Sequence, residues 1–124
     1  PLYSSAASDV YKRQVSMSTV SLENFQRLDL RIGKVLKAER IPERRKIYKL
    51  QIDVGTQQIQ TIAGGAEYYS PEYFQGRAVI VLLNLEPKTI GGIESKGMLL
   101  AADFQGKPVW LTIGEEVPAG TKVR

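Results

Sequence analysis

Apolar and polar side chains alternate along much of the chain, which is the period of a half-buried β-strand. The alternation starts at Leu30 and runs to about Glu39, with a slip near Gly33 that indicates a bulge or a sharp bend within one long strand. It returns over residues 47–54 and, after a turn, over residues 58–63. The pattern therefore predicts three consecutive strands.

Two short helices and several further extended segments complete the pattern. Ser21 is placed to cap a helix that runs to Arg27, and Ser70-Pro71 starts a second one that ends at Gly76. Apolar runs and turn residues predict later strands over residues 79–85, 98–103 and 109–113, and an extended tail over residues 117–123.

This order of elements predicts an all-β chain with the OB-fold, a five-stranded Greek-key barrel that has a short helix between strands three and four, here with a C-terminal extension. Tyr48 falls on the apolar phase of the second strand and is expected in the core. Tyr68, Tyr69, Tyr73 and Phe74 surround the second helix and are expected to seal the bottom of the barrel. OB barrels bind oligonucleotides on the face of strands two and three, but a fold alone does not specify a function.

The segment between the strands predicted at 79–85 and 98–103 is longer than the two to about five residues that a hairpin needs. Surplus loop on a rigid scaffold is typical of a binding loop. Asn84 and Ser95 could contact a ribose or a base edge, or could cap the loop itself. Met98 could offer a soft apolar surface to an unstacked base, or could pack in the core. Lys88 and Lys96 are candidate phosphate contacts in the same loop.

Composition limits the chemistry that the chain can perform. It contains no histidine and no cysteine, which excludes serine-histidine and cysteine-histidine catalysis. Carboxylates could still form an acid-base or metal site, but the acidic residues are scattered along the sequence. We therefore expect a binding protein without a cofactor, a metal site or catalytic residues.

Basic residues are concentrated between Arg27 and Lys49, where nine basic and three acidic residues give a local net charge of +6 in a chain of net charge +4. Such a distribution is expected for a polyanion partner, although it could also serve solubility. The densest part is Arg44, Arg45 and Lys46, at the entry of the second strand. These residues are either phosphate anchors or solvated tips. Lys34 and Lys49 are further candidate cations.

Residues 1–17 show no sustained period and are expected to be a disordered leader or an artefact, with Met17 as a plausible start and residues 18–124 as a single domain. No stretch approaches the roughly 18 apolar residues that a membrane span requires. We expect a cytoplasmic protein with no membrane partner.

Four sequence words carry a resemblance to a known family. They are Phe25-Gln-Arg-Leu-Asp-Leu-Arg-Ile-Gly-Lys-Val35, Tyr48-Lys-Leu-Gln-Ile-Asp-Val-Gly55, Asn84-Leu-Glu-Pro-Lys88 and Gly92-Ile-Glu-Ser-Lys-Gly-Met-Leu-Leu-Ala-Ala102. In this order they resemble the tRNA-binding OB domain family, found as the beta subunit or C-terminal domain of methionyl-tRNA synthetase and as a free tRNA-binding protein. The family's usual Ala-Asp-Lys-Leu word is here Arg44-Arg-Lys-Ile47, which keeps Lys46 and replaces an acid by Arg45.

The resemblance implies tRNA as the partner, a possible methionyl-tRNA synthetase catalytic subunit as a second partner, and a homodimer built through the terminal extensions. The expected dimer contacts are Leu22 and Phe25 on the first helix and Trp110 and Val117 near the C-terminus. The alternative is a chaperone-like homodimer of the same fold that binds unfolded polypeptide.

Overall fold

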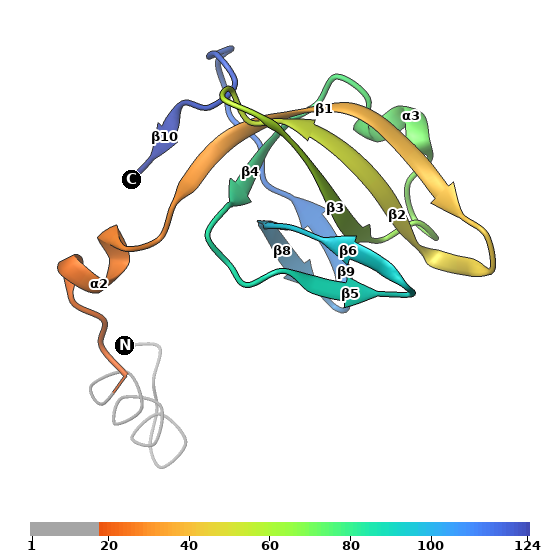
Figure 1. Cartoon of the computed structure of the whole chain (residues 1–124), viewed down its shortest axis with the longest axis horizontal. Helices are drawn as coiled ribbons and strands as arrows, with labels where there is room; N and C mark the ends of the chain where they lie inside the picture. Colours follow the sequence, from red (N-terminus) through yellow and green to blue (C-terminus); the bar gives the residue numbers. More distant parts are fainter. Residues whose placement is uncertain (1–17) are drawn as a thin grey trace.

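Five antiparallel strands wrap into a nearly closed barrel in the computed structural model, which describes residues 18–124 (Figure 1). The predicted leader, residues 1–17, lies outside the described residues. The order across the sheet is β3, β2, β1, β4, β7. These strands are β1 (Leu30–Ile41), β2 (Arg44–Asp53), β3 (Gln58–Gly64), β4 (Ala78–Leu82) and β7 (Met98–Leu99).

The barrel closes where the chain just before β7 returns to β3. The Lys96 amide donates to the Gln60 carbonyl at 2.9 Å, and the Ile62 amide donates to the Ser95 hydroxyl at 3.0 Å. With a helix between β3 and β4, this is the predicted all-β barrel of the OB type, and the fold prediction is confirmed.

The core follows from the period-two pattern of the strands. Tyr48, Leu50 and Ile52 on β2 are fully buried, as their phase predicts. Phe74 of α3 (Pro71–Phe74) closes the bottom of the barrel and meets the Tyr48 ring edge-on with centroids 5.6 Å apart. Gly33 is buried as well, and a side chain would not fit there, because a Cβ atom would lie 2.6 Å from a methyl carbon of Ile52.

The bend predicted in β1 is present over a longer stretch than Gly33. Ile32 and Gly33 are both buried, which marks the change of phase. The register against β2 shifts between Val35 and Lys37, which makes Leu36 the bulged residue, and again between Arg40 and Ile41. This bend lets one strand pair with β4 along its first part and with β2 along its second part.

The later strands differ from the prediction. The run predicted at 79–85 ends as β4 at Leu82, and Leu85 is exposed. The run predicted at 98–103 divides into β7 and β8 (Ala101–Phe104), and β8 leaves the barrel to pair with β9 (Lys107–Trp110), which ends before the predicted limit of 113. Apolar composition does not distinguish a barrel strand from a projecting hairpin.

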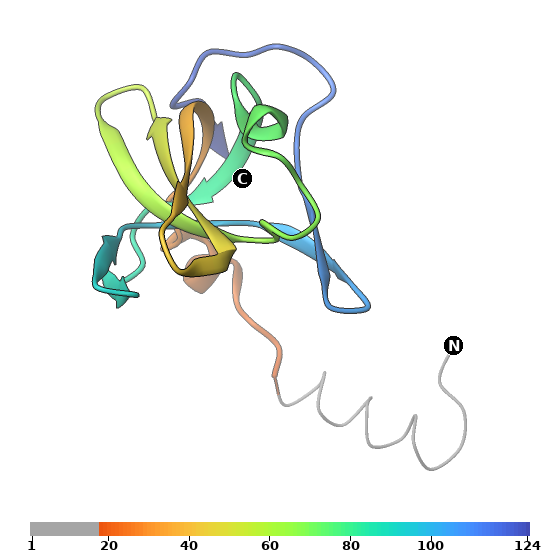
Figure 2. The same cartoon turned by 90° about the vertical axis from the view of Figure 1, so that its right-hand side faces the viewer.

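The long loop contains a hairpin that the sequence did not predict, formed by β5 (Lys88–Ile90) and β6 (Ile93–Ser95). Gly91 and Gly92 form its turn with positive φ angles of 60° and 80°. Figure 2 shows the β1–β2 tip between this hairpin and the β8–β9 hairpin.

The first predicted helix is confirmed as α2 (Leu22–Gln26), and the Asn24 amide donates to the Ser21 hydroxyl at 3.0 Å. Ser70 precedes α3 but makes no capping hydrogen bond through its side chain. Within residues 18–124, no helix has the length and apolar character needed to cross a membrane.

The C-terminal segment, residues 120–123, lies along the start of β1 and is called the strap below. Strand β10 (Lys122–Val123) pairs with β1, and the Gly120 amide donates to the Ile32 carbonyl at 2.7 Å. Asp29 binds Arg31 at 2.7 Å and Lys122 at 3.4 Å, and the hydrogen bond from Arg31 is the main reason why the pKa of Asp29 is lowered. The strap therefore holds the start of β1 by charge and by backbone contacts.

Candidate nucleic-acid interface

The basic run lies at the tip of the β1–β2 hairpin, inside β2 rather than ahead of it as predicted. Glu43 makes the turn with a positive φ of 66°. Arg44, Arg45 and Lys46 are exposed, and none of the three forms an ion pair among residues 18–124. We refer to these three residues as the basic tip. Its charges are open to an anion.

The long loop faces the same side as the basic tip. A Cβ atom on Gly91 would lie 3.1 Å from Nε of Arg44, so the turn of the β5–β6 hairpin lies directly against this guanidinium. A hollow of about 400 Å³ separates the two hairpins and is lined by residues 43–47 and Ile90. The segments far apart in sequence thus form one surface.

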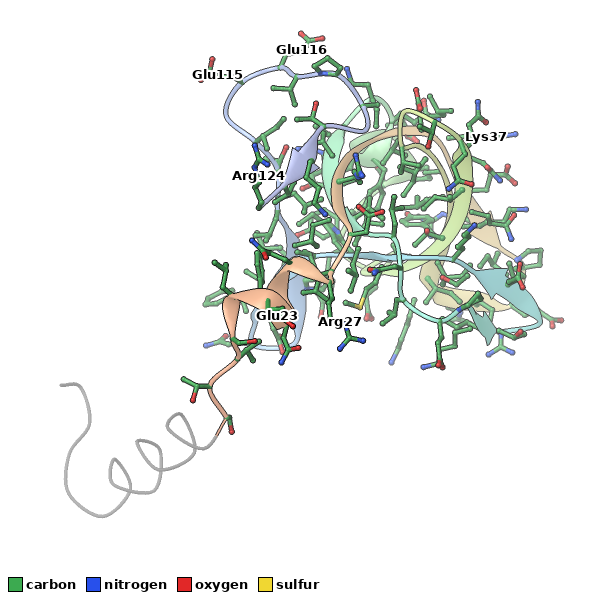
Figure 3. The ribbon with its side chains drawn as sticks, turned by 60° about the vertical axis from the view of Figure 1, so that its left-hand side comes forward. Glu23, Arg27, Lys37, Glu115, Glu116 and Arg124 are labelled. Atoms are coloured by element: carbon green, nitrogen blue, oxygen red, sulfur yellow. The ribbon has the colours of Figure 1, made fainter. Side chains whose placement is uncertain are left out.

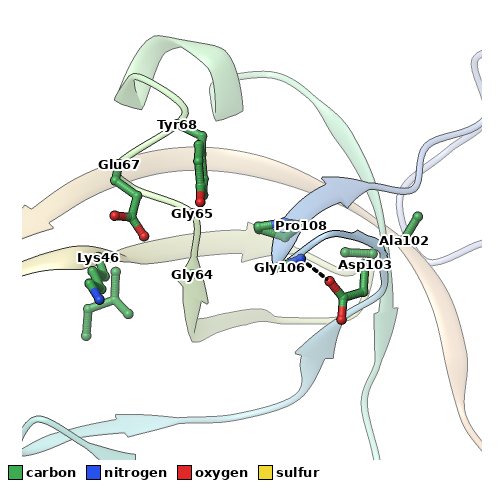
Figure 4. A pocket seen from close by; sticks show the side chains of 11 residues that line it. Lys46, Gly64, Gly65, Glu67, Tyr68, Ala102, Asp103, Gly106 and Pro108 are labelled. Carbon is green, nitrogen blue, oxygen red and sulfur yellow. Dashed lines mark hydrogen bonds between the residues drawn. The ribbon is translucent and has the colours of Figure 1, made fainter.

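A groove of about 420 Å³ lies on the other flank of the basic tip (Figure 4). Its walls come from the ends of β2 and β3, from the loop after β3 and from the β8–β9 hairpin. The polar and aromatic side chains that line it are those of Lys46, Glu67, Tyr68 and Asp103. Lys46 lines both this groove and the hollow beside β5, so the two are continuous around the tip.

The outer face of β2 and β3 connects to this surface. Gln51 and Gln60 are cross-strand partners whose side-chain amides lie 3.4 Å apart. Lys49 is on the same face but pairs with Glu39 at 3.7 Å, and Glu39 also binds Lys37 at 3.1 Å. The hydrogen bond from Lys37 and the nearby positive charges lower the pKa of Glu39, which therefore stays ionised beside the two lysines.

Two of the predicted loop contacts serve the fold. Ser95 is buried and accepts the hydrogen bond from the Ile62 amide that closes the barrel. Asn84 is exposed, but its carbonyl oxygen accepts from the Asp29 amide at 2.8 Å and its amino group donates to the Arg27 carbonyl at 2.6 Å. These side chains join the loop to distant parts of the chain, which differs both from a ribose or base contact and from the alternative in which they cap the loop itself.

The other loop residues are available to a ligand. Met98 is 44 % exposed, so the alternative that placed it in the core is wrong. Lys88 and Lys96 are exposed and form no ion pair within the described part of the chain.

Lys34 lies apart from the basic tip. It is half buried and binds Glu116 at 3.6 Å, beside a hollow lined by Gly76, Ala78 and residues 113–117. Figure 3 shows Glu115 and Glu116 on a loop that stands off the barrel, away from α2 with Glu23 and Arg27. Glu116 on this loop thus pairs with the cation that the sequence grouped with the basic run.

The residues expected at a dimer interface fall into two environments. Leu22 and Phe25 on α2 are exposed. Trp110 and Val117 are half buried, and the Trp110 ring packs against Phe74 with centroids 5.8 Å apart. Trp110 therefore supports the core.

The main feature that the sequence did not reveal is the position of Tyr68. Tyr69 and Tyr73 pack together around Phe74 as expected, but Tyr68 is 51 % exposed and lines the groove, so its assignment to the barrel bottom was wrong. Four aromatic residues within seven positions gave no signal to single out one of them. Among residues 18–124, the acidic side chains form no group of three that could hold a metal ion.

Comparisons with known proteins identify relatives of this chain. The family model described as "Putative tRNA binding domain" matches residues 30–122. The methionine-tRNA ligase of Archaeoglobus fulgidus is 51 % identical over 104 residues, which are 84 % of this chain and 16 % of the ligase. The methionine-tRNA ligase of Thermotoga maritima is 40 % identical over an alignment of 128 positions, gaps included, which covers 99 % of this chain and 20 % of the ligase. The chain thus spans a fifth or less of the length of these curated relatives.

Solved structures share the fold over most of this chain. A MetRS-related protein from Pyrococcus horikoshii matches with a TM-score of 0.82 and 35 % identity, covering 87 % of this chain and 100 % of that protein. The chaperone CsaA from Bacillus anthracis matches with a TM-score of 0.78 and 33 % identity, covering 86 % and 100 %. Because the family model matches three quarters of its length, the chain belongs to the putative tRNA binding domain family.

Proposed function

We propose that this chain is a non-catalytic tRNA-binding module that raises the tRNA affinity of a separate catalytic subunit, with methionyl-tRNA synthetase as the candidate partner in the cytoplasm. The observation that carries the proposal is the basic tip, three adjacent cations that are exposed and unpaired within the described chain and are held against the β5–β6 hairpin. Cations of this kind bind phosphates without reading sequence.

The surface is suited to the shape and backbone of a folded RNA. It combines the cations of the basic tip with those of Lys88 and Lys96 on the neighbouring loop, and Met98 is exposed at the end of that loop. Double-helical RNA is recognised mainly through its phosphates and 2′-hydroxyls. We therefore expect binding to depend strongly on salt and weakly on sequence.

The test is equilibrium binding of unfractionated tRNA to the full chain over a range of salt concentrations. Counterion release predicts that the logarithm of the binding constant falls linearly with the logarithm of the salt concentration, with a slope of about −0.7 to −0.9 for each phosphate contact. Adding the chain to the catalytic subunit should also lower the KM for tRNA without changing kcat at saturation. Absence of salt-dependent tRNA binding would contradict the proposal.

We also propose that the chain forms a homodimer, in which two basic tips could meet one large RNA. The exposed apolar face of α2 supports this, since Leu22 is 70 % and Phe25 is 38 % exposed. Sedimentation should give about twice the monomer mass. Phe25→Glu should shift it toward monomer without unfolding the barrel, whereas Trp110→Glu would disturb the packing on Phe74 and is the less informative variant.

The second candidate is binding of unfolded polypeptide, because a structure named chaperone CsaA matches nearly the whole barrel. The salt dependence of binding distinguishes the two functions. Binding of a reduced, carboxymethylated protein that persists in high salt, together with an absence of tRNA binding, would favour the second.

A further inference from the structure

The groove on the flank of the basic tip contains an aromatic platform. Among the tyrosines that the structure describes, only Tyr68 is exposed, and it lies next to Glu67 at the mouth of the groove (Figure 4). Lys46 and Glu67 are on one side of the view and Asp103 on the other, with Tyr68 and Pro108 between them. An exposed ring in a groove is a surface on which a planar group can stack.

The walls of the groove are fixed without a ligand. The hydroxyl of Tyr69 donates to the Pro108 carbonyl at 2.7 Å, which ties the β8–β9 hairpin to the loop after β3. Gly65 lies against the Pro108 ring, since a Cβ atom there would be 2.9 Å from its Cγ. The Ala66 amide donates to the Lys46 carbonyl at 3.2 Å. A ligand therefore meets a preformed groove and loses little affinity to ordering it.

Positive and negative side chains both lie around the Tyr68 ring, and each sign suits a different part of a nucleotide. Lys107 has its ammonium 5.8 Å from the centre of the Tyr68 ring, and Lys46 extends the groove to the basic tip. Both can bind a phosphate. The carboxylates of Glu67 and Asp103 repel phosphate but accept hydrogen bonds from an amino group. One Asp103 oxygen already accepts from the Gly106 amide at 2.9 Å, which holds that side chain in place.

We propose that this groove binds an unstacked RNA base that carries an exocyclic amino group. The base stacks on Tyr68, its amino group donates to the Glu67 carboxylate, and a neighbouring phosphate binds Lys46. Adenine, cytosine and guanine fit this description, whereas uracil presents carbonyl oxygens in place of the amino group. The proposal rests on the proposed RNA-binding function and adds a base-reading position to a surface that otherwise reads phosphates.

The first experiment measures tRNA binding by the full chain and its Tyr68 variants across salt concentrations. Tyr68→Ala should weaken binding about tenfold with an unchanged salt slope, because a stacking contact is lost and no charge is removed. Tyr68→Phe should keep the affinity within about twofold, because the ring is retained. Phe104→Ala is the matched control: Phe104 is 62 % exposed on the β8–β9 hairpin but does not line the groove, and we expect no loss.

The second experiment compares short fluorescently labelled oligocytidylate and oligouridylate. The wild-type chain should bind the cytidine oligomer more tightly, and Glu67→Gln should narrow the difference, because the amide can also donate to a uracil carbonyl. Melting curves of all variants should coincide with that of the wild type, since the substituted side chains are exposed.

The outcomes separate the two proposals. Salt-dependent tRNA binding that Tyr68→Ala leaves unchanged, or that Phe104→Ala reduces equally, would overturn the base groove and leave the RNA-binding function intact. Equal binding of the two oligomers by the wild-type chain would also overturn it. If Tyr68→Ala abolishes binding of a carboxymethylated polypeptide but leaves tRNA binding unchanged, the groove binds protein and not RNA. A wild-type chain that binds no tRNA would defeat the proposed function itself.

Discussion

The cations near the two ends of strand β1 are in opposite states. Past its far end, at the start of β2, the basic tip is exposed and forms no ion pair with any other described residue. Near the start of β1, Arg31 is bound by Asp29 at 2.7 Å and Lys34 by Glu116 at 3.6 Å. A single basic stretch of sequence is therefore divided by the fold into one end open to an anion and one end that holds the C-terminal strap. Local net charge cannot make this distinction.

The largest expected effect on tRNA affinity comes from removing the three cations of the basic tip. Replacing Arg44, Arg45 and Lys46 together by Ala should weaken tRNA binding on the order of a hundredfold at low salt and reduce the salt slope by about two to three, one for each cation. Binding titrations at several salt concentrations measure both quantities. The matched control is Lys34→Ala at the paired end, which should leave affinity and slope nearly unchanged. Equal losses of tRNA affinity in the two variants would show that the cations at the two ends do not differ in their role.

A smaller effect, on stability and not on tRNA affinity, is expected in the C-terminal segment that pairs with the start of β1. A Cβ atom on Gly120 would lie 2.8 Å from the Val54 carbonyl oxygen, at a φ of +91° that L side chains rarely adopt. Gly120→Ala should therefore lower the free energy of unfolding by about 3 kcal/mol, measured by denaturant titration. Gly114→Ala, with no atom within 4 Å of the added Cβ and no positive φ, is the control. The folded fraction of Gly120→Ala should bind tRNA normally, and reduced affinity would show that the strap takes part in binding.

The smallest effect should come from Glu39, an acidic residue near the basic tip. Glu39 neutralises Lys37 and Lys49 on the outer face of the barrel. Glu39→Gln should free both lysines, raise tRNA affinity about two- to threefold and steepen the salt slope slightly. Glu116→Gln, which frees Lys34 instead, should change neither quantity. An unchanged affinity in Glu39→Gln would confine the interface to the tip and its hairpins.

The first three strands of the barrel were predictable because each has a half-buried phase. Tyr48 is an example, since alternation alone places it in the core, where it is fully buried. The β5–β6 hairpin was not predictable, because its short strands are polar and depend on the turn at Gly91 and Gly92.

The candidate surface was predictable only in part. The basic tip is contiguous in sequence and could be found directly. Its contact with Gly91 is tertiary, and so are the hydrogen bond that buries Ser95 and the ion pair that engages Lys34. Tyr68 differs from its aromatic neighbours only in direction, which the backbone of the loop sets.

The closure of β3 has a consequence for how the protein behaves in solution. An open strand edge is a template for pairing with other chains, and native sheets protect such edges. Here the Ser95 hydroxyl and the Lys96 backbone occupy hydrogen-bonding groups along β3 that would otherwise be free. The barrel thereby avoids edge-to-edge aggregation at the strand nearest its binding loop. Amide exchange at Ile62 should consequently be slow, and faster exchange there would be an early sign of the barrel opening toward an aggregation-prone state.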